Sequence, residues 1–74
     1  MSALLQPSQL LSFLLFDLVM ADSFGALRDA EHHGLGAVYA LRLSGLISEA
    51  EHLEAAAQLK EQAKQRRTQL RAGQ

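Results

Sequence analysis

Three stretches of the chain carry apolar residues at helical spacing, and turn-forming residues separate them. The first stretch spans residues 7–21 and begins with Pro7 and Ser8, two residues that favour the start of a helix. The second spans residues 23–44 and the third spans residues 48–70. These patterns predict an all-α fold with a helical hairpin preceded by one very apolar helix, together forming a single small domain over residues 1–74.

The first predicted helix is apolar over almost its whole surface. At 100° per residue its apolar side chains surround the axis, and only Ser12 and Asp17 interrupt them. A helix of this kind is normally buried on all sides, which the rest of so short a chain can hardly achieve. We therefore expect a homodimer, with an interface formed by Leu11, Leu14, Leu15 and Leu18.

Two glycines interrupt the pattern of the second segment. Gly34 and Gly36 each cost about 1 kcal/mol in a helix interior relative to alanine. We therefore favour one long helix with a possible bend, and the alternative is two helices that meet near His33, which would give four helices in all.

The boundary between the second and third helices has the clearest local signal. Gly45 suits the left-handed position that ends a helix. Ser48 and Glu51 have the spacing of a capping box, in which each side chain binds a backbone N–H of the other residue. The last helix should therefore begin at Ser48.

This boundary also resembles a known family. From about Tyr39 to Lys64 the chain resembles the short C-terminal (SHOCT) domain of bacterial proteins, although His52 stands where that family usually has an aromatic residue. The resemblance implies an interaction or oligomerisation element without catalytic residues. In overall appearance the chain is also similar to small phage-encoded regulators of host proteins. The matching residues are Leu41, Leu43, Gly45, Leu46, Ile47, Ser48, Glu49 and Glu51.

Composition excludes several classes of protein. The 74 residues include no cysteine, which excludes disulfides, thiolate metal sites and thiol nucleophiles. A chain of this size buries only about 60% of its unfolded surface, so a partner subunit would stabilise it. The apolar run Leu10–Met20 is shorter than the roughly 20 residues that cross a bilayer, and no signal peptide is evident. We therefore expect a cytoplasmic protein.

Candidate chemistry is sparse. Asp29 and His33 lie one helical turn apart, beside Glu31 and His32, and His52 could supply another metal ligand. The paired short spacings of zinc sites are missing, so we expect a solvated polar patch rather than a metal site. No nucleophile elbow or phosphate-binding loop occurs. The sequence thus predicts neither an enzyme nor a cofactor.

The third helix carries basic residues along one side. Lys60, Lys64, Arg67 and Arg71 recur at helical spacing and could contact phosphates. The formal net charge is nevertheless −1, and no recognition helix rich in base-reading side chains is evident. A nucleic-acid-binding dimer is therefore the alternative function.

Binding to another protein is the favoured function. Tyr39 and Arg42 are residue types enriched at interface hot spots, and Leu43 and Leu46 follow them. These four residues could line a groove for a segment of a partner. We expect a small regulator that inhibits or tethers a cellular or host target, such as a transcriptional regulator or an assembly ATPase. Adsorption of Leu10–Met20 to a membrane surface is a third possibility, but Asp17 and the absence of flanking lysine or arginine argue against it, so we expect no membrane partner.

Overall fold

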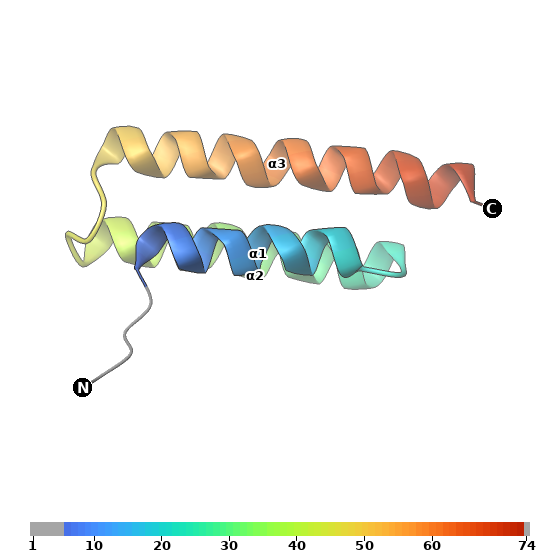
Figure 1. Cartoon of the computed structure of the whole chain (residues 1–74), viewed down its shortest axis with the longest axis horizontal. Coiled ribbons are helices and arrows are strands. Elements are labelled where there is room, and N and C mark those ends of the chain that lie inside the picture. The colour runs from blue at the N-terminus through green and yellow to red at the C-terminus, as the bar shows by residue number, and fades with distance from the viewer. Residues whose placement is uncertain (1–5, 74) are drawn as a thin grey trace.

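The fold is a bundle of three antiparallel helices. The computed structural model describes residues 6–73, which form α1 (Pro7–Met20), α2 (Phe24–Leu43) and α3 (Glu49–Ala72) and contain no strand. The three helices run side by side, each reversing the direction of the one before it (Figure 1). The predicted all-α class is confirmed, and each observed helix end lies within two residues of its expected position. Residues 1–5 and 74 of the expected domain lie outside the described residues.

Side-chain caps explain where two of the helices begin. The Ser23 hydroxyl accepts a hydrogen bond of 3.0 Å from the backbone N–H of Ala26, at the start of α2. At the start of α3 the N–H of Glu51 donates to Ser48 Oγ at 3.1 Å, and the N–H of Ser48 donates to Glu51 Oε1 at 2.8 Å. The predicted capping box is therefore confirmed, and both starts are fixed by local sequence.

α2 runs without a break through its two glycines, so the described residues form three helices and not four. Gly34 is buried against α3, where a Cβ atom would lie 3.4 Å from two methyl groups of Leu59 and 3.8 Å from Leu14 Cβ. Leu59 of α3 and Leu14 of α1 thus pack around Gly34 at the level where the three helices meet. This packing stabilises a helix that Gly34 would weaken in isolation.

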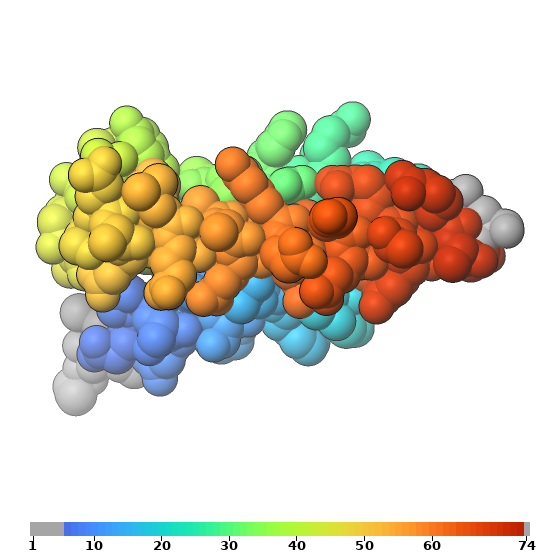
Figure 2. All heavy atoms as spheres, turned by 90° about the horizontal axis from the view of Figure 1, so that it is seen from above, coloured from blue at the N-terminus to red at the C-terminus, as the bar shows by residue number. Residues whose placement is uncertain are grey.

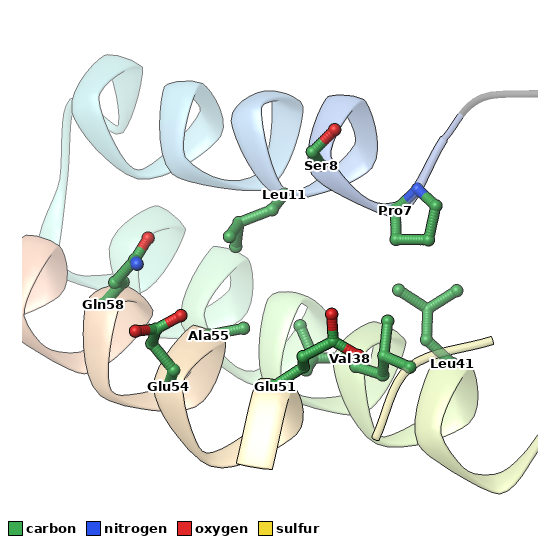
Figure 3. Close-up of a pocket in the computed structure, with 10 residues that line it drawn as sticks. Pro7, Ser8, Leu11, Val38, Leu41, Glu51, Glu54, Ala55 and Gln58 are labelled. Atoms are coloured by element: carbon green, nitrogen blue, oxygen red, sulfur yellow. The ribbon is translucent and has the colours of Figure 1, made fainter. Parts of the chain in front are cut away.

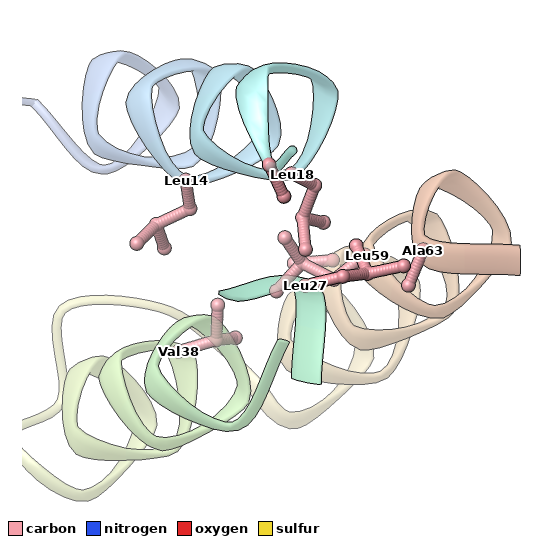
Figure 4. Packing of buried hydrophobic residues seen from close by; sticks show 8 residues of the cluster. Leu14, Leu18, Leu27, Val38, Leu59 and Ala63 are labelled. Carbon is pink, nitrogen blue, oxygen red and sulfur yellow. The ribbon is translucent and has the colours of Figure 1, made fainter. Parts of the chain in front are cut away.

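The core is a narrow column of small and branched side chains along the axis of the bundle (Figure 4). α3 lies over the line where α1 and α2 meet, as Figure 2 shows, and every pair of helices is in contact. Arg66 fastens α3 to the turn between α1 and α2, because its Nε donates to the carbonyl oxygen of Ala21 at 2.8 Å. The buried apolar residues are Leu14, Leu18, Ala21, Leu27, Val38, Ala55, Leu59 and Ala63.

Within the single chain α1 is buried on one face only. The principal extents of the molecule are 44 × 28 × 15 Å, so the bundle is long and flat. Leu14 and Leu18 point into the core, whereas Phe13 and Phe16 are exposed. The reason is geometric, since two neighbouring helices can cover only about half of the circumference of a third.

Candidate protein-binding surfaces

The turn between α2 and α3 presents two leucines to solvent on a rigid backbone. Gly45 has a φ of 80°, and the N–H of Leu46 donates to the carbonyl of Leu41 at 3.0 Å. The N–H of Gly45 donates to the carbonyl of Arg42, also at 3.0 Å. Together these bonds form a Schellman motif, which satisfies the last carbonyls of α2. The turn therefore holds Leu43 and Leu46 in fixed positions at the end of the hairpin.

A polar cluster joins the two helices beside this turn. Arg42 Nη1 lies 3.5 Å from Nδ1 of His52, and Arg42 Nη2 lies 3.7 Å from a carboxylate oxygen of Glu49. The ring of Tyr39 packs against the ring of His52, with centroids 5.8 Å apart and planes tilted by 52°. Arg42 thus links α2 to α3, and Tyr39 extends the linked surface along α2.

Exposed apolar side chains gather at this end of the hairpin, and we call them the hairpin patch. Its members are between 49% and 68% exposed. Three members of the patch, Tyr39, Leu43 and Leu46, were predicted as partner-binding residues. The other residue predicted to bind a partner, Arg42, is partly buried and contacts Glu49 and His52 instead. The hairpin patch consists of Tyr39, Leu43, Leu46 and Leu53.

Leu53 is not among the predicted site residues, and it lies outside the face of α3 that packs against the other two helices. The structure buries Leu59 on that face and leaves Leu53 exposed. At 100° per residue, side chains six residues apart are separated by about 120° around the helix axis, so Leu53 points away from the face that buries Leu59. This angular separation was the signal that could have placed Leu53 on the surface.

A second apolar surface lies on α1, and we call it the α1 outer face. Its members, Phe13, Phe16, Val19 and Met20, are between 43% and 61% exposed. The predicted dimer interface is wrong in two of its residues, because Leu14 and Leu18 are buried in the core of the chain itself. The other two, Leu11 and Leu15, are partly buried and pack against the same core.

A small cavity opens where the start of α1 faces α2 and α3. Its volume is about 200 Å³, and Leu11 of α1 faces Val38 and Leu41 of α2 across it (Figure 3). Glu51 and Glu54 of α3 also line it. Pockets for small-molecule ligands usually measure about 300–1,000 Å³, so this one has room for little more than a single apolar side chain.

One of the four basic residues predicted to line one side of α3, Arg67, forms an ion pair with α2. Arg67 Nη2 donates to Glu31 Oε1 at 3.1 Å, and this Glu31 side chain is only 19% exposed. Arg67 is therefore used to hold α3 against α2. The remaining members, Lys60, Lys64 and Arg71, are exposed.

The histidines are separated by the fold. His32 and His33 are exposed on α2, whereas His52 is occupied by the ring of Tyr39 and the guanidinium of Arg42. Among residues 6–73, no three His, Asp or Glu side chains lie close enough together to hold a metal ion. Within this part of the chain, His52 of α3 therefore does not join the polar patch around His32 as a further metal ligand.

Comparisons of the chain with known protein families, curated proteins and solved structures found no match. The resemblance of residues 39–64 to the SHOCT hairpin therefore stays a prediction. Within the described part of the chain, none of the helices is both long enough and apolar enough to cross a membrane.

Proposed function

We propose that this protein is a non-enzymatic regulator that binds another protein through the hairpin patch. The observation that carries the proposal is the exposure of Leu43 and Leu46 at the end of a capped turn. Large apolar side chains that a folded chain leaves exposed as a group are typical of interaction sites. The regulator would inhibit or tether its target and would act as a homodimer.

The hairpin patch combines features that favour binding. The turn and the Arg42–Glu49 contact hold its backbone in place, which lowers the entropy lost on association. Tyr39 offers an aromatic ring and a hydroxyl group at the edge of the apolar surface. Such a surface suits an amphipathic helix or an extended segment of a partner that contributes its own apolar side chains.

A capture experiment with matched variants tests this proposal. The tagged chain is used to capture proteins from a nuclease-treated bacterial lysate, in parallel with a Leu43→Ser, Leu46→Ser double variant. Phe24→Ser is the control, because Phe24 is also exposed but lies at the opposite end of α2. We expect the native chain and the control to retain the same protein, and the double variant to lose it. Equal recovery by all three chains would contradict the proposal.

The alternative function, nucleic-acid binding, predicts a different outcome. Lys60, Lys64 and Arg71 are exposed on α3 and could contact phosphates. In that case recovery would disappear after nuclease treatment. Binding to duplex DNA would also weaken steeply with salt and with replacement of these three residues by glutamine.

A further inference from the structure

We propose that the α1 outer face binds the same face of a second copy, with the two α1 helices antiparallel and their twofold axis near Phe13. This inference deepens the dimeric part of the proposed function, on which it rests, and replaces the interface predicted from sequence. It does not depend on what the hairpin patch binds. The two surfaces share no residue, so each can be tested alone.

The exposed residues of α1 form one continuous face opposite the core. At 100° per residue, Phe16 lies about 160° around the helix from Leu18. Phe13 and Met20 lie about 60° and 40° to one side of Phe16 and are both more than half exposed, and Val19 lies about 60° to the other side. α1 therefore has two apolar faces, and its own chain covers only one of them.

The size of this face matches what a dimer of small subunits needs. Large side chains bury roughly 150–250 Å² each, so four half-exposed ones present on the order of 400 Å². Two copies would remove on the order of 800 Å² of apolar surface from water, and flanking residues bring the total near the roughly 1,000 Å² of a specific interface. The area of the α1 outer face in a single copy is also similar to that of the largest apolar patches on ordinary monomers, and such patches are often functional.

The shape of the face is self-complementary. Phe13 and Phe16 flank a shallow hollow whose other lining residues are Gln9 and Ser12. In an antiparallel pair centred near Phe13, Phe16 of each copy lies opposite residues 9–12 of the other and can enter this hollow. The Ser12 hydroxyl already donates to the carbonyl of Ser8 at 3.1 Å, so burying it leaves no unpaired donor. A twofold interface requires such a projection and recess on one surface.

The charges of α1 permit this pairing. Asp17 is the only charged residue of the helix, and at 100° per residue it lies at the edge of the outer face. With the axis near Phe13, the two copies of Asp17 are about 12 Å apart along the helices, at a rise of about 1.5 Å per residue. That separation exceeds the screening length of about 8 Å at physiological salt. No lysine or arginine of α1 would lose its hydration on dimerisation, since the helix contains neither.

Sedimentation equilibrium on the full chain tests the proposal. We expect concentration-dependent dimerisation of the native chain, and Phe16→Asp should raise the dissociation constant at least about tenfold. Leu53→Asp is the matched control, because it adds the same charge at an equally exposed position of the hairpin patch. Helical content measured by circular dichroism should be unchanged in both variants, since neither side chain is buried. A native chain that stays monomeric at about 100 μM would overturn the proposal.

Cross-linking tests the arrangement directly, because the chain contains no cysteine. In a glutathione redox buffer, Ser12→Cys should form a disulfide-linked dimer across the axis. Thr68→Cys, on the exposed side of α3, should stay monomeric in the same buffer. Equal cross-linking of both variants would contradict a specific interface at α1.

Binding of a monomeric chain to zwitterionic lipid vesicles, abolished by Phe16→Asp, would also overturn the proposal and assign the face to a membrane surface. These results are distinct from failure of the proposed function, which would appear as unchanged partner capture by the hairpin double variant.

Discussion

Two glycine substitutions should change the stability of this protein in opposite directions. Gly36 and Gly45 are both exposed, and a Cβ atom added to either would meet no atom within 4 Å. Neither substitution removes or adds a packing contact, so only the backbone conformation distinguishes them. Gly36 lies inside α2, whereas Gly45 has a φ of 80° in the turn that ends this helix.

The two magnitudes follow from these conformations. Gly36→Ala should stabilise the fold by about 0.5–1 kcal/mol, because alanine loses less backbone entropy in a helix than glycine does. Gly45→Ala forces an L-residue into the left-handed region, which costs about 1–2 kcal/mol. The reduced entropy of the unfolded chain offsets roughly 0.4–1 kcal/mol of that cost. The net effect of Gly45→Ala should be a destabilisation of up to about 1.6 kcal/mol.

Urea and thermal unfolding followed by circular dichroism would measure both effects. Each kcal/mol corresponds to a shift of about 4–8 °C in Tm for a domain of this size. All samples must have the same protein concentration, because self-association makes Tm depend on concentration. Destabilisation by Gly36→Ala would refute a continuous helix through residue 36. A Gly45→Ala variant that is stabilised as much as the Gly36→Ala variant would refute the left-handed conformation of the turn.

Substitutions at three other positions test the core, the cap and the ion pair by the same unfolding measurement. Leu59→Ala should cost about 2–5 kcal/mol, since Leu59 is fully buried, and a loss below about 1 kcal/mol would contradict its central position. Ser48→Ala should cost about 1 kcal/mol and Ser48→Asp much less, because aspartate retains an acceptor for the N–H of Glu51. Glu31→Gln should cost less than about 1 kcal/mol at low salt, since Arg67 is 39% exposed, and a larger loss would show that this pair is a main support of α3.

The parts of the fold that depend on local chemistry were predictable from sequence. Gly45, Ser48 and Glu51 act on backbone groups within a few residues of themselves. Their types and spacing therefore predicted the end of one helix and the start of the next. Leu43 and Leu46 are exposed at the intervening turn, and their role in binding a partner stays a prediction.

The parts that depend on tertiary packing were not predictable in the same way. An apolar pattern on every side of α1 does not reveal which side its own chain covers, so Leu14 and Leu18 were assigned to the wrong neighbour. Helix propensity likewise left open whether the second helix breaks near Gly34, whereas the structure shows one continuous helix in which Gly34 packs against Leu59. Pairing of Arg67 with Glu31 joins residues 36 positions apart, a separation that no helical spacing encodes.

Dimerisation through the α1 outer face would change how the hairpin patch binds. A dimer carries two hairpin patches on one particle, so its second contact with a multimeric target is intramolecular and gains from effective concentration. Phe16→Asp should therefore weaken binding to an immobilised, dense target by about 10²-fold or more, and leave binding to a single dissolved target molecule unchanged. Surface plasmon resonance at high and low target density separates these two cases. An equal loss of binding at both target densities would show that Phe16 contacts the target itself. The α1 outer face and the hairpin patch would then both belong to the target-binding surface.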